Sequence, residues 1–238
     1  MPKATERQSF KKYVYFFWIL AALPFVFLFL ILFLASKGYI GQELPTFDEL
    51  ENPRSNLASE IYSSDKVILG KYFFQNRTNI HYYELSPVLL SALKATEDVR
   101  FDDHSGVDLR GLLRVVLFAG KAGGGSTITQ QLAKKLFHDS PDNKLERIIQ
   151  KLQEWIISVQ LERRYTKEEI IAMYLNTVDF SSNAYGIKSA AQTYFSKTPF
   201  DLNTQEAAML IGMLKAPSRF NPVRNPKTSM DLSLSSDR

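Results

Sequence analysis

Two adjacent carboxylates, Glu97 and Asp98, are the first residues whose types and spacing could do chemistry, and Phe101 and His104 follow them closely. A pair of carboxylates at the end of a helix is suited to taking up or releasing a proton during a reaction. A solvated acidic helix end is the alternative, because surface acids commonly have no catalytic role. Spacing alone leaves both interpretations open.

A glycine-rich segment forms the second candidate. Three glycines, 123–125, are followed by Ser126 and Thr127, which open directly into a helical run from Ile128 to Phe137. The N–H groups at such a helix start can bind a phosphate. A turn capped by Ser126 or Thr127 is the other interpretation. The segment lacks the Gly-Lys-Ser/Thr ending of a nucleotide-binding loop, which argues against an ATPase.

A third candidate lies on a helix predicted from Asn143 to Arg163, where Lys151 and Glu154 are three positions apart and can pair. At about 100° per residue, Glu154 points away from the apolar stripe of this helix, so its carboxylate faces either solvent or a cleft. The stripe that we expect to be buried consists of Leu145, Ile148, Ile149, Leu152, Ile156 and Val159.

Other kinds of site find little support. The chain has no cysteine, which excludes a thiol nucleophile, and it has no Gly-x-Ser-x-Gly elbow. Its three histidines are far apart and lack the spacing of zinc ligands. We therefore expect no required cofactor and no metal held by protein ligands. A role for a divalent cation, Mg²⁺ or Mn²⁺, stays open.

The elements that must position these candidates are mostly helices. Ser86 as N-cap and Pro87 at the first helical position predict a helix that runs toward Glu97. Alternating apolar and polar residues between 58 and 74 predict a hairpin of short strands. Two capping boxes predict two further helices: Thr166 with Glu169, and Asn203 with Glu206.

An uncharged run from Val14 to Ala35 predicts a membrane anchor. As a helix it covers roughly 33 Å, which matches a hydrocarbon core about 30 Å thick. A cleaved signal peptide is the alternative, but its apolar core is usually about 7–15 residues long. Four basic residues precede the run, so we expect the N-terminus in the cytoplasm and the remaining chain on the outer side of the membrane.

The net charge of +4 at pH 7 is concentrated near the N-terminus. The rest of the chain is close to neutral, and this excludes the extended basic face that nucleic-acid binding needs. We therefore expect no nucleic-acid partner.

Five motifs, taken in order, resemble those of the peptidoglycan glycosyltransferase family. The similarity runs from about Leu57 to Pro226, and its first part resembles the class A penicillin-binding proteins. The motifs are Glu97-Asp98-x-x-Phe101-x-x-His104-x-Gly106, Gly125-Ser126-Thr127-Ile128-Thr129-Gln130-Gln131-Leu132, Lys151-x-x-Glu154, Lys167-x-x-Ile170-x-x-x-Tyr174-Leu175-Asn176, and Ala216-Pro217-Ser218 with Asn221-Pro222.

This resemblance implies a mainly α, lysozyme-like domain with a short β-hairpin region. It also implies polymerisation of lipid II, in which a glycan chain moves with inversion from its undecaprenyl pyrophosphate carrier to the C4 hydroxyl of the next disaccharide. The implied partners are lipid II, the growing glycan strand, membrane lipid and possible cell-wall synthesis proteins. A hydrolytic muramidase and an inactive membrane-anchored scaffold of the same fold are the alternatives.

The resemblance also implies the roles of individual residues. Glu97 would be the general base for the acceptor hydroxyl, while Glu154 would act on the donor side, where the leaving pyrophosphate needs cations and hydrogen-bond donors. The residues implied in substrate binding are Asp98, Phe101, His104, Gly125, Ser126, Thr127, Thr129, Gln130, Gln131, Lys134, Lys151 and Asn176.

Some positions depart from the family pattern. Gln150 stands where the family usually has arginine, which removes a cation from the donor side. Ser181 and Ser196 stand where the family commonly has glycine, and we expect both to be structural variants. Beyond Pro226 the resemblance ends, so we expect a fragment of a longer protein and assign it no transpeptidase domain.

These observations divide the chain into five predicted segments. They are a basic tail (1–13), a transmembrane helix (14–35), a stalk (36–56), a glycosyltransferase domain (57–226) and a disordered tail (227–238).

Overall fold

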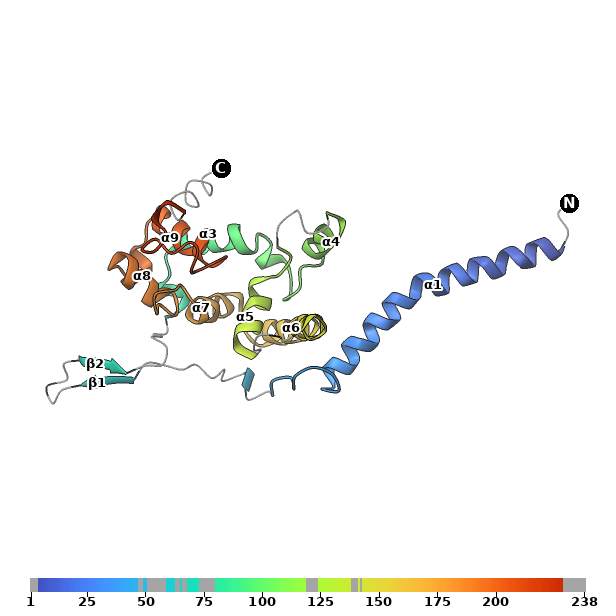
Figure 1. Ribbon diagram of the computed structural model, residues 1–238, viewed down its shortest axis with the longest axis horizontal. Helices are drawn as coiled ribbons and strands as arrows, with labels where there is room; N and C mark the ends of the chain where they lie inside the picture. The colour runs from blue at the N-terminus through green and yellow to red at the C-terminus, as the bar shows by residue number, and fades with distance from the viewer. Residues whose placement is uncertain are drawn as a thin grey trace. The chain divides into compact units, whose positions relative to one another are not determined.

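The computed structural model describes residues 4–46, 49–50, 59–62, 65, 68–72, 80–118, 124–137, 141 and 143–228. This part of the chain is mainly helical, as predicted (Figure 1). The longer helices are α1 (Ala4–Ser36), α3 (Pro87–Glu97), α4 (Leu109–Leu117), α5 (Ile128–Phe137), α6 (Lys144–Arg164), α7 (Lys167–Thr177), α8 (Ile187–Phe195) and α9 (Thr204–Met213). The short 3-10 helices are η1 (Tyr82–Glu84), η2 (Phe101–Asp103) and η3 (Pro199–Asp201).

The chain forms two compact units. The first comprises residues 1–44 and 140–156, and the second comprises 45–139 and 157–238. Helix α6 contributes its first part to the first unit and its last part to the second.

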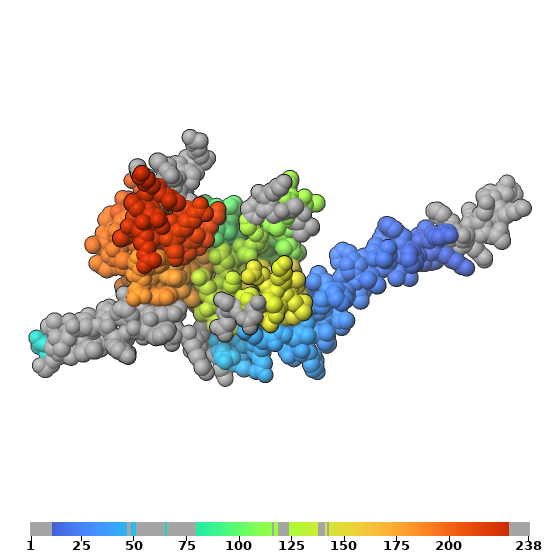
Figure 2. Space-filling view, viewed as in Figure 1, coloured from blue at the N-terminus to red at the C-terminus, as the bar shows by residue number. Residues whose placement is uncertain are grey.

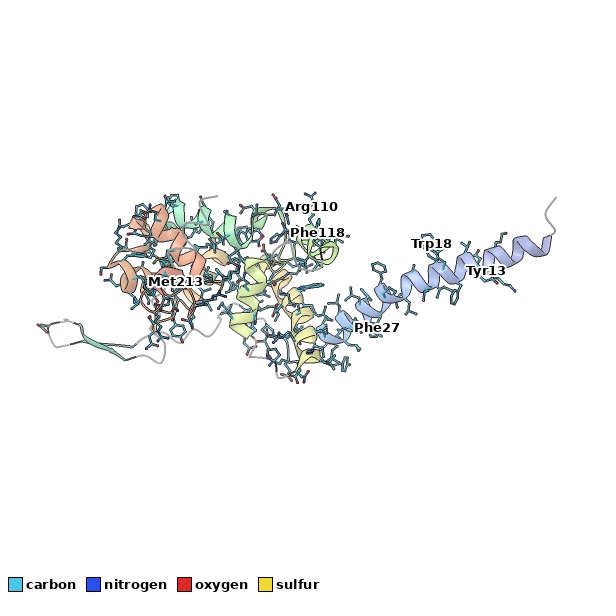
Figure 3. The ribbon with its side chains drawn as sticks, turned by 45° about the horizontal axis from the view of Figure 1, so that its top comes forward. Tyr13, Trp18, Phe27, Arg110, Phe118 and Met213 are labelled. Atoms are coloured by element: carbon cyan, nitrogen blue, oxygen red, sulfur yellow. The ribbon has the colours of Figure 1, made fainter. Side chains whose placement is uncertain are left out.

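Helix α1 of the first unit is long and apolar enough to cross a membrane, because the 26 residues from Lys11 to Ser36 include a window of mean hydropathy 2.8. It continues through Pro24, as expected for a proline in a spanning helix. Its large side chains are exposed, and Tyr13, Trp18 and Phe27 project from it in different directions (Figure 3). Lipid is the environment that suits such a surface.

The chain after α1 is fixed to α6 within the first unit. The side-chain amide of Gln153 accepts from the N–H of Gln42 and donates to its carbonyl oxygen. This pair of bonds satisfies a stretch of backbone that lies outside regular secondary structure.

Two antiparallel strands, β1 (Ser59–Tyr62) and β2 (Ile68–Tyr72), form the predicted hairpin. Ser59 pairs with Tyr72 and Ile61 with Gly70, and a register irregularity falls between Ile61 and Tyr62. The hairpin lies within the second unit.

The predicted helix starts are confirmed. Ser86 caps α3 by accepting from the N–H of Leu89, and Pro87 is the first helical residue. Both capping boxes form, at the starts of α7 and α9. Helix α3 packs against α9, and α5 packs against α7, so these four helices bury much of the apolar surface of the second unit. Figure 2 shows α8 and α9 forming one continuous surface of orange and red residues.

The predicted stripe of α6 is largely wrong. Leu152 is the one member of that stripe that is buried, whereas Leu145 is 67% and Ile148 is 60% exposed. The buried face carries polar side chains among its apolar ones, including Glu154, which is 4% exposed. Apolar periodicity could not identify this face because half of its residues are polar. The solvent-facing alternative for Glu154 is therefore excluded.

Helix α4 exposes an apolar surface. Leu109, Leu113, Leu117 and Phe118 are all more than half exposed, and Arg110 extends from the same helix (Figure 3). Residues 229–238 of the predicted tail (227–238) lie outside the described residues, as do 47–48 and 51–56 of the predicted stalk (36–56).

Candidate active site

Glu97 is the last residue of α3, and its side chain is half-buried. The amide nitrogen of Gln131, on α5, donates to Glu97 Oε2 over 2.7 Å. The first and second motifs therefore meet through a direct hydrogen bond between two residues that the sequence implicated in substrate chemistry. The carboxylate retains a second oxygen that does not contact Gln131.

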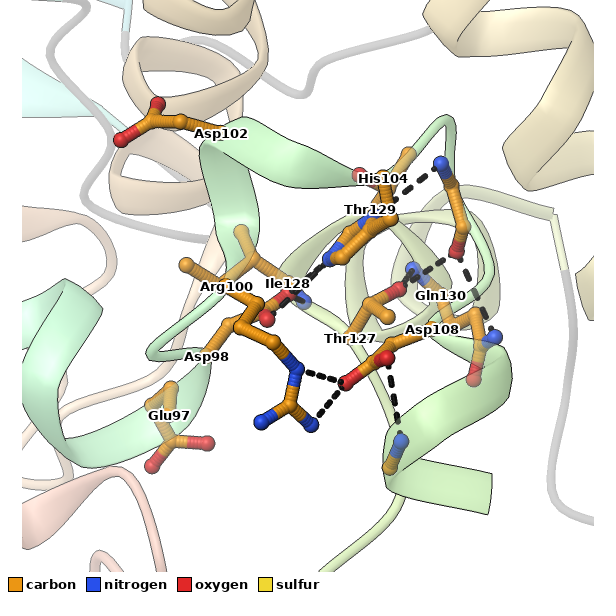
Figure 4. A network of polar contacts seen from close by, with 12 residues as sticks. Glu97, Asp98, Arg100, Asp102, His104, Asp108, Thr127, Ile128, Thr129 and Gln130 are labelled. Carbon is orange, nitrogen blue, oxygen red and sulfur yellow. Dashed lines mark hydrogen bonds and ion pairs between the residues drawn. The ribbon is translucent and has the colours of Figure 1, made fainter. Parts of the chain in front are cut away.

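Asp98 is buried and occupies the C-cap position of α3. Its carboxylate lies 3.0 Å from His104 Nε2 and accepts from the backbone N–H of Ile128, the first residue of α5, as Figure 4 shows. A buried carboxylate requires such donors. Adjacent carboxylates thus have different environments, because Asp98 is enclosed by protein groups while Glu97 remains accessible.

Lys167, at the start of α7, supports the loop that carries His104. Its ammonium forms an ion pair with Glu162 at 2.7 Å, donates to the carbonyl oxygen of His104 and lies 4.3 Å from the ring centre of Phe101. Phe101 is completely buried. The predicted role of Phe101 in substrate binding stays a prediction, and its contacts in the structure are with the protein.

The residues that open α5 bond to the rest of the second unit. Thr127 Oγ1 donates to the carbonyl oxygen of Gly106 over 2.7 Å and accepts from the N–H of Gln130. The cap interpretation is therefore confirmed for Thr127, while the phosphate interpretation stays a prediction. Gln130 also donates to Gly106 (Figure 4). Thr129 donates to Glu162.

Gly106 fits this position because its backbone is left-handed, with φ of 91°. A Cβ atom there would lie 2.8 Å from the backbone of Ser158 on α6. Glycine therefore allows the loop, the start of α5 and the end of α6 to approach one another.

Tyr174 of α7 is hydrogen-bonded to the same Gln131 side chain that bonds to Glu97. Its hydroxyl donates to Gln131 Oε1 over 2.9 Å, and the ring is 1% exposed. Burial, with the nearby Glu97 carboxylate, raises the pKa of Tyr174 above its ordinary value. The hydroxyl thus keeps its proton and remains a donor.

Asn176 contributes in another way. Its amide accepts from the N–H of Ile80 and donates to the carbonyl oxygen of the same residue, each over 2.9 Å. These bonds position the segment before η1, and the substrate-binding role implied for Asn176 stays a prediction.

Lys151 and Glu154 belong to the first unit. Lys151 Nζ lies 2.7 Å from Glu154 Oε2, so the predicted pair forms. The ammonium is partly exposed and the carboxylate is buried. The pair gives α6 a cation whose charge is partly balanced by its neighbour.

The other implied residues differ in exposure. Gly125 and Ser126 are half-buried before α5, and Lys134 is exposed in its last turn. Among the residues that the structure describes, no three acids or histidines form a group that could hold a metal ion.

Sequence reasoning missed three contributors to this site. Lys167 and Tyr174 stand seven positions apart, on one face of α7, and their presence in the fourth motif was a signal that could have identified them. Glu162 carried no signal beyond its charge.

The Transglycosylase family matches residues 65–233, which is more than half of the chain. This chain belongs to the Transglycosylase family.

Similar proteins carry the name penicillin-binding protein 1A. The one from Pseudomonas aeruginosa is 36% identical over 81% of this chain and 24% of its own length, and the one from Escherichia coli is 40% identical over 78% and 22%. The Neisseria flavescens protein is 41% identical over 78% of this chain and 23% of its own. The chain thus spans less than a quarter of these relatives.

A crystal structure of penicillin-binding protein 1A from Haemophilus influenzae matches 77% of this chain and 17% of that one, with 21% identity and a TM-score of 0.39.

Proposed function

We propose that this chain is a membrane-anchored peptidoglycan glycosyltransferase. It polymerises lipid II into β-linked glycan strands with inversion and releases undecaprenyl pyrophosphate, for bacterial cell-wall synthesis. Family membership and the apolar helix α1 support the proposal. The observation that carries it is the bond from Gln131 to Glu97, because it joins the two motifs around an accessible carboxylate.

Glu97 acts as the general base. Gln131 donates a hydrogen bond to one oxygen of the Glu97 carboxylate. The other carboxylate oxygen accepts the proton of the acceptor C4 hydroxyl while the hydroxyl oxygen attacks the anomeric carbon of the donor. The bond to the pyrophosphate breaks in the same displacement, which inverts the configuration at that carbon.

In the second unit, Lys134 and the 126–131 segment at the start of α5 stabilise the leaving pyrophosphate on the donor side. In the first unit, Lys151 pairs with Glu154, so a phosphate bound by this lysine must share or take over its ammonium. A divalent cation, Mg²⁺ or Mn²⁺, would assist by neutralising part of the pyrophosphate charge.

The remaining proposed partners are the growing glycan strand, membrane lipid around α1 and other cell-wall synthesis proteins. The chain sits in the inner membrane as a single-pass protein with its catalytic domain on the periplasmic face.

Lipid II polymerisation by the purified chain in detergent tests the proposal. Glu97→Gln keeps the hydrogen bond to Gln131 possible but removes the base, so we expect the rate to fall by at least about 100-fold. Glu168→Gln, an exposed acid on α7, is the matched control and should polymerise normally. Full activity of Glu97→Gln would remove Glu97 from this role.

The same preparations separate the alternatives. Release of muropeptides from isolated cell wall would favour the muramidase. Binding of moenomycin, an inhibitor that mimics the donor, without any turnover of lipid II would favour the inactive scaffold.

A further inference from the structure

Three side chains from three helices form an unbranched chain of hydrogen bonds that ends on the proposed base. Tyr174 of α7 donates to Gln131 of α5, and Gln131 donates to Glu97 at the end of α3. The bonds are 2.9 Å and 2.7 Å long. We propose that Tyr174 is a positioning residue that acts on Glu97 through Gln131, and this inference rests on the proposed function of Glu97.

The amide of Gln131 has two possible orientations, and only one of them suits the base. An ionised carboxylate can only accept hydrogen bonds, so the NH₂ group of Gln131 must face Glu97. The carbonyl oxygen then faces Tyr174, whose hydroxyl supplies a proton. The tyrosine therefore selects the amide orientation in which Glu97 receives a donor.

Burial makes this selection effective. Tyr174 is 1% exposed, and its raised pKa keeps the hydroxyl protonated at any pH at which the reaction would run. The packing of α5 against α7 fixes the distance between the two side chains. Without the hydroxyl, Gln131 is free to rotate, and the Glu97 carboxylate loses its fixed direction.

Misdirection of a general base slows the chemical step more than it weakens binding of the substrate. Tyr174→Phe, which removes one oxygen and keeps the ring, should therefore lower kcat by about 10-fold and leave KM within about twofold.

Tyr194→Phe is the matched control. Tyr194 lies on α8, where its hydroxyl donates to the carbonyl oxygen of Phe180 and is linked to Asn221. Tyr194→Phe removes the same kind of hydroxyl group as Tyr174→Phe does, but from a position that does not contact Gln131 or Glu97. Thermal unfolding should show comparable small losses for both variants, while kcat should fall only for Tyr174→Phe.

A double-mutant cycle tests whether Gln131 transmits the effect. In a Gln131→Ala background, Tyr174→Phe should change kcat by less than about twofold, because the side chain that it orients is gone. An equal loss in both backgrounds would overturn the inference. So would a Tyr174→Phe enzyme with the kcat of the wild-type chain.

A second readout separates this inference from the proposed function. Gln131 side-chain NH₂ resonances, identified by their loss in Gln131→Ala, should exchange with water at least about 10-fold faster in Tyr174→Phe but not in Tyr194→Phe. If the wild-type chain fails to polymerise lipid II, the proposed function fails. The exchange rates of these resonances then decide by themselves whether Tyr174 orients the Gln131 side chain. Unchanged exchange in Tyr174→Phe would overturn it.

Discussion

At the residue scale, helix α5 provides two neighbouring carboxylates with different hydrogen-bond donors. Ile128 and Gln131 stand three positions apart on α5, and the first binds Asp98 through its backbone while the second binds Glu97 through its side chain. Asp98 is enclosed together with His104, so it holds the loop and α5 together. Glu97 is half-buried, and in the proposed mechanism it accepts the proton of the reacting hydroxyl.

The ion pair of Asp108 with Arg100 predicts a pH dependence of stability. Burial acts to raise the pKa of Asp108, but hydrogen bonds from Arg100 and from the N–H of Gly111 outweigh it, and the pKa lies below its ordinary value of 3.8. A carboxylate with a lowered folded-state pKa stabilises the fold above its ordinary pKa and loses this contribution as the pH falls through the folded-state value.

Asp108→Asn should therefore lower the thermal midpoint at pH 7, and its deficit relative to the wild-type chain should shrink below the ordinary Asp108 pKa of 3.8. Thermal unfolding followed by circular dichroism across this range measures the difference. Glu168→Gln is the control and should show no such change with pH. A deficit that is constant from neutral to acidic pH would contradict the prediction.

The sequence identified the candidate residues of the site better than it predicted the hydrogen bonds and ion pairs between them. The adjacent carboxylates, the glycine-rich helix start and the pair on α6 could each be identified from spacing. The bonds of Tyr174, Glu162 and Lys167 could not, because they join helices that are distant along the chain and depend on tertiary packing.

At the element scale, the helix starts show the same contrast. Caps at Ser86, Thr166 and Asn203 use local rules and were predicted correctly. The buried face of α6 was predicted wrongly because it places Gln153, Glu154 and other polar groups inside. Apolar periodicity is reliable only where the buried face is apolar.

Two serines occupy left-handed backbone where the family commonly has glycine. Ser196 ends α8 with φ of 54°, and Ser181 has φ of 64°. Ser196 is exposed, whereas Ser181 Oγ accepts from Asn221 over 3.2 Å. Left-handed backbone therefore costs conformational free energy at both serines. At Ser181 the hydrogen bond from Asn221 offsets part of this cost, whereas Ser196 has no such bond to the part of the chain that the structure describes.

Ser196→Gly should therefore stabilise the chain by about 0.5 kcal/mol, the relief of left-handed strain less the entropy that glycine adds to the unfolded state. Ser181→Gly should be neutral or destabilising, since it also loses the bond to Asn221. Ser91→Gly, in the exposed middle of α3, is the control and should destabilise by about 0.5 kcal/mol. Chemical unfolding would measure this order, and equal effects at Ser196 and Ser91 would contradict it.

The close approach at Gly106 gives another element-scale prediction. Gly106→Ala places a methyl group against the backbone of Ser158 in a strained conformation, which should destabilise by about 1–3 kcal/mol. A Cβ at Gly124 would meet nothing within 4 Å, so Gly124→Ala is the matched control. Thermal midpoints of the two variants should differ by several degrees, and similar midpoints would show that the loop adapts.

At the scale of the whole molecule, the charge distribution and α1 together predict an orientation. The basic residues near the N-terminus favour the cytoplasm, and α1 is long and apolar enough to span. In the proposed function, this orientation places the second unit on the periplasmic face, where a lipid-linked substrate can be met at the membrane surface.

Because the chain has no cysteine, single introduced cysteines can report this orientation. Val223→Cys, at a position that is 75% exposed in the second unit, should react with a membrane-impermeant maleimide in intact spheroplasts. Gln8→Cys, before the apolar part of α1, should react only after lysis. The reverse pattern of labelling would contradict the orientation.

The direction of the hydrogen bonds that end on Glu97 limits where its proton can go. Tyr174 and Gln131 both donate toward the carboxylate, and an amide does not release its own proton at ordinary pH. In the proposed mechanism, a proton gained by Glu97 therefore has no exit through Gln131 into the interior. It would leave on the side of the acceptor, so each turnover of that mechanism requires the product or solvent to restore the base before the next acceptor arrives.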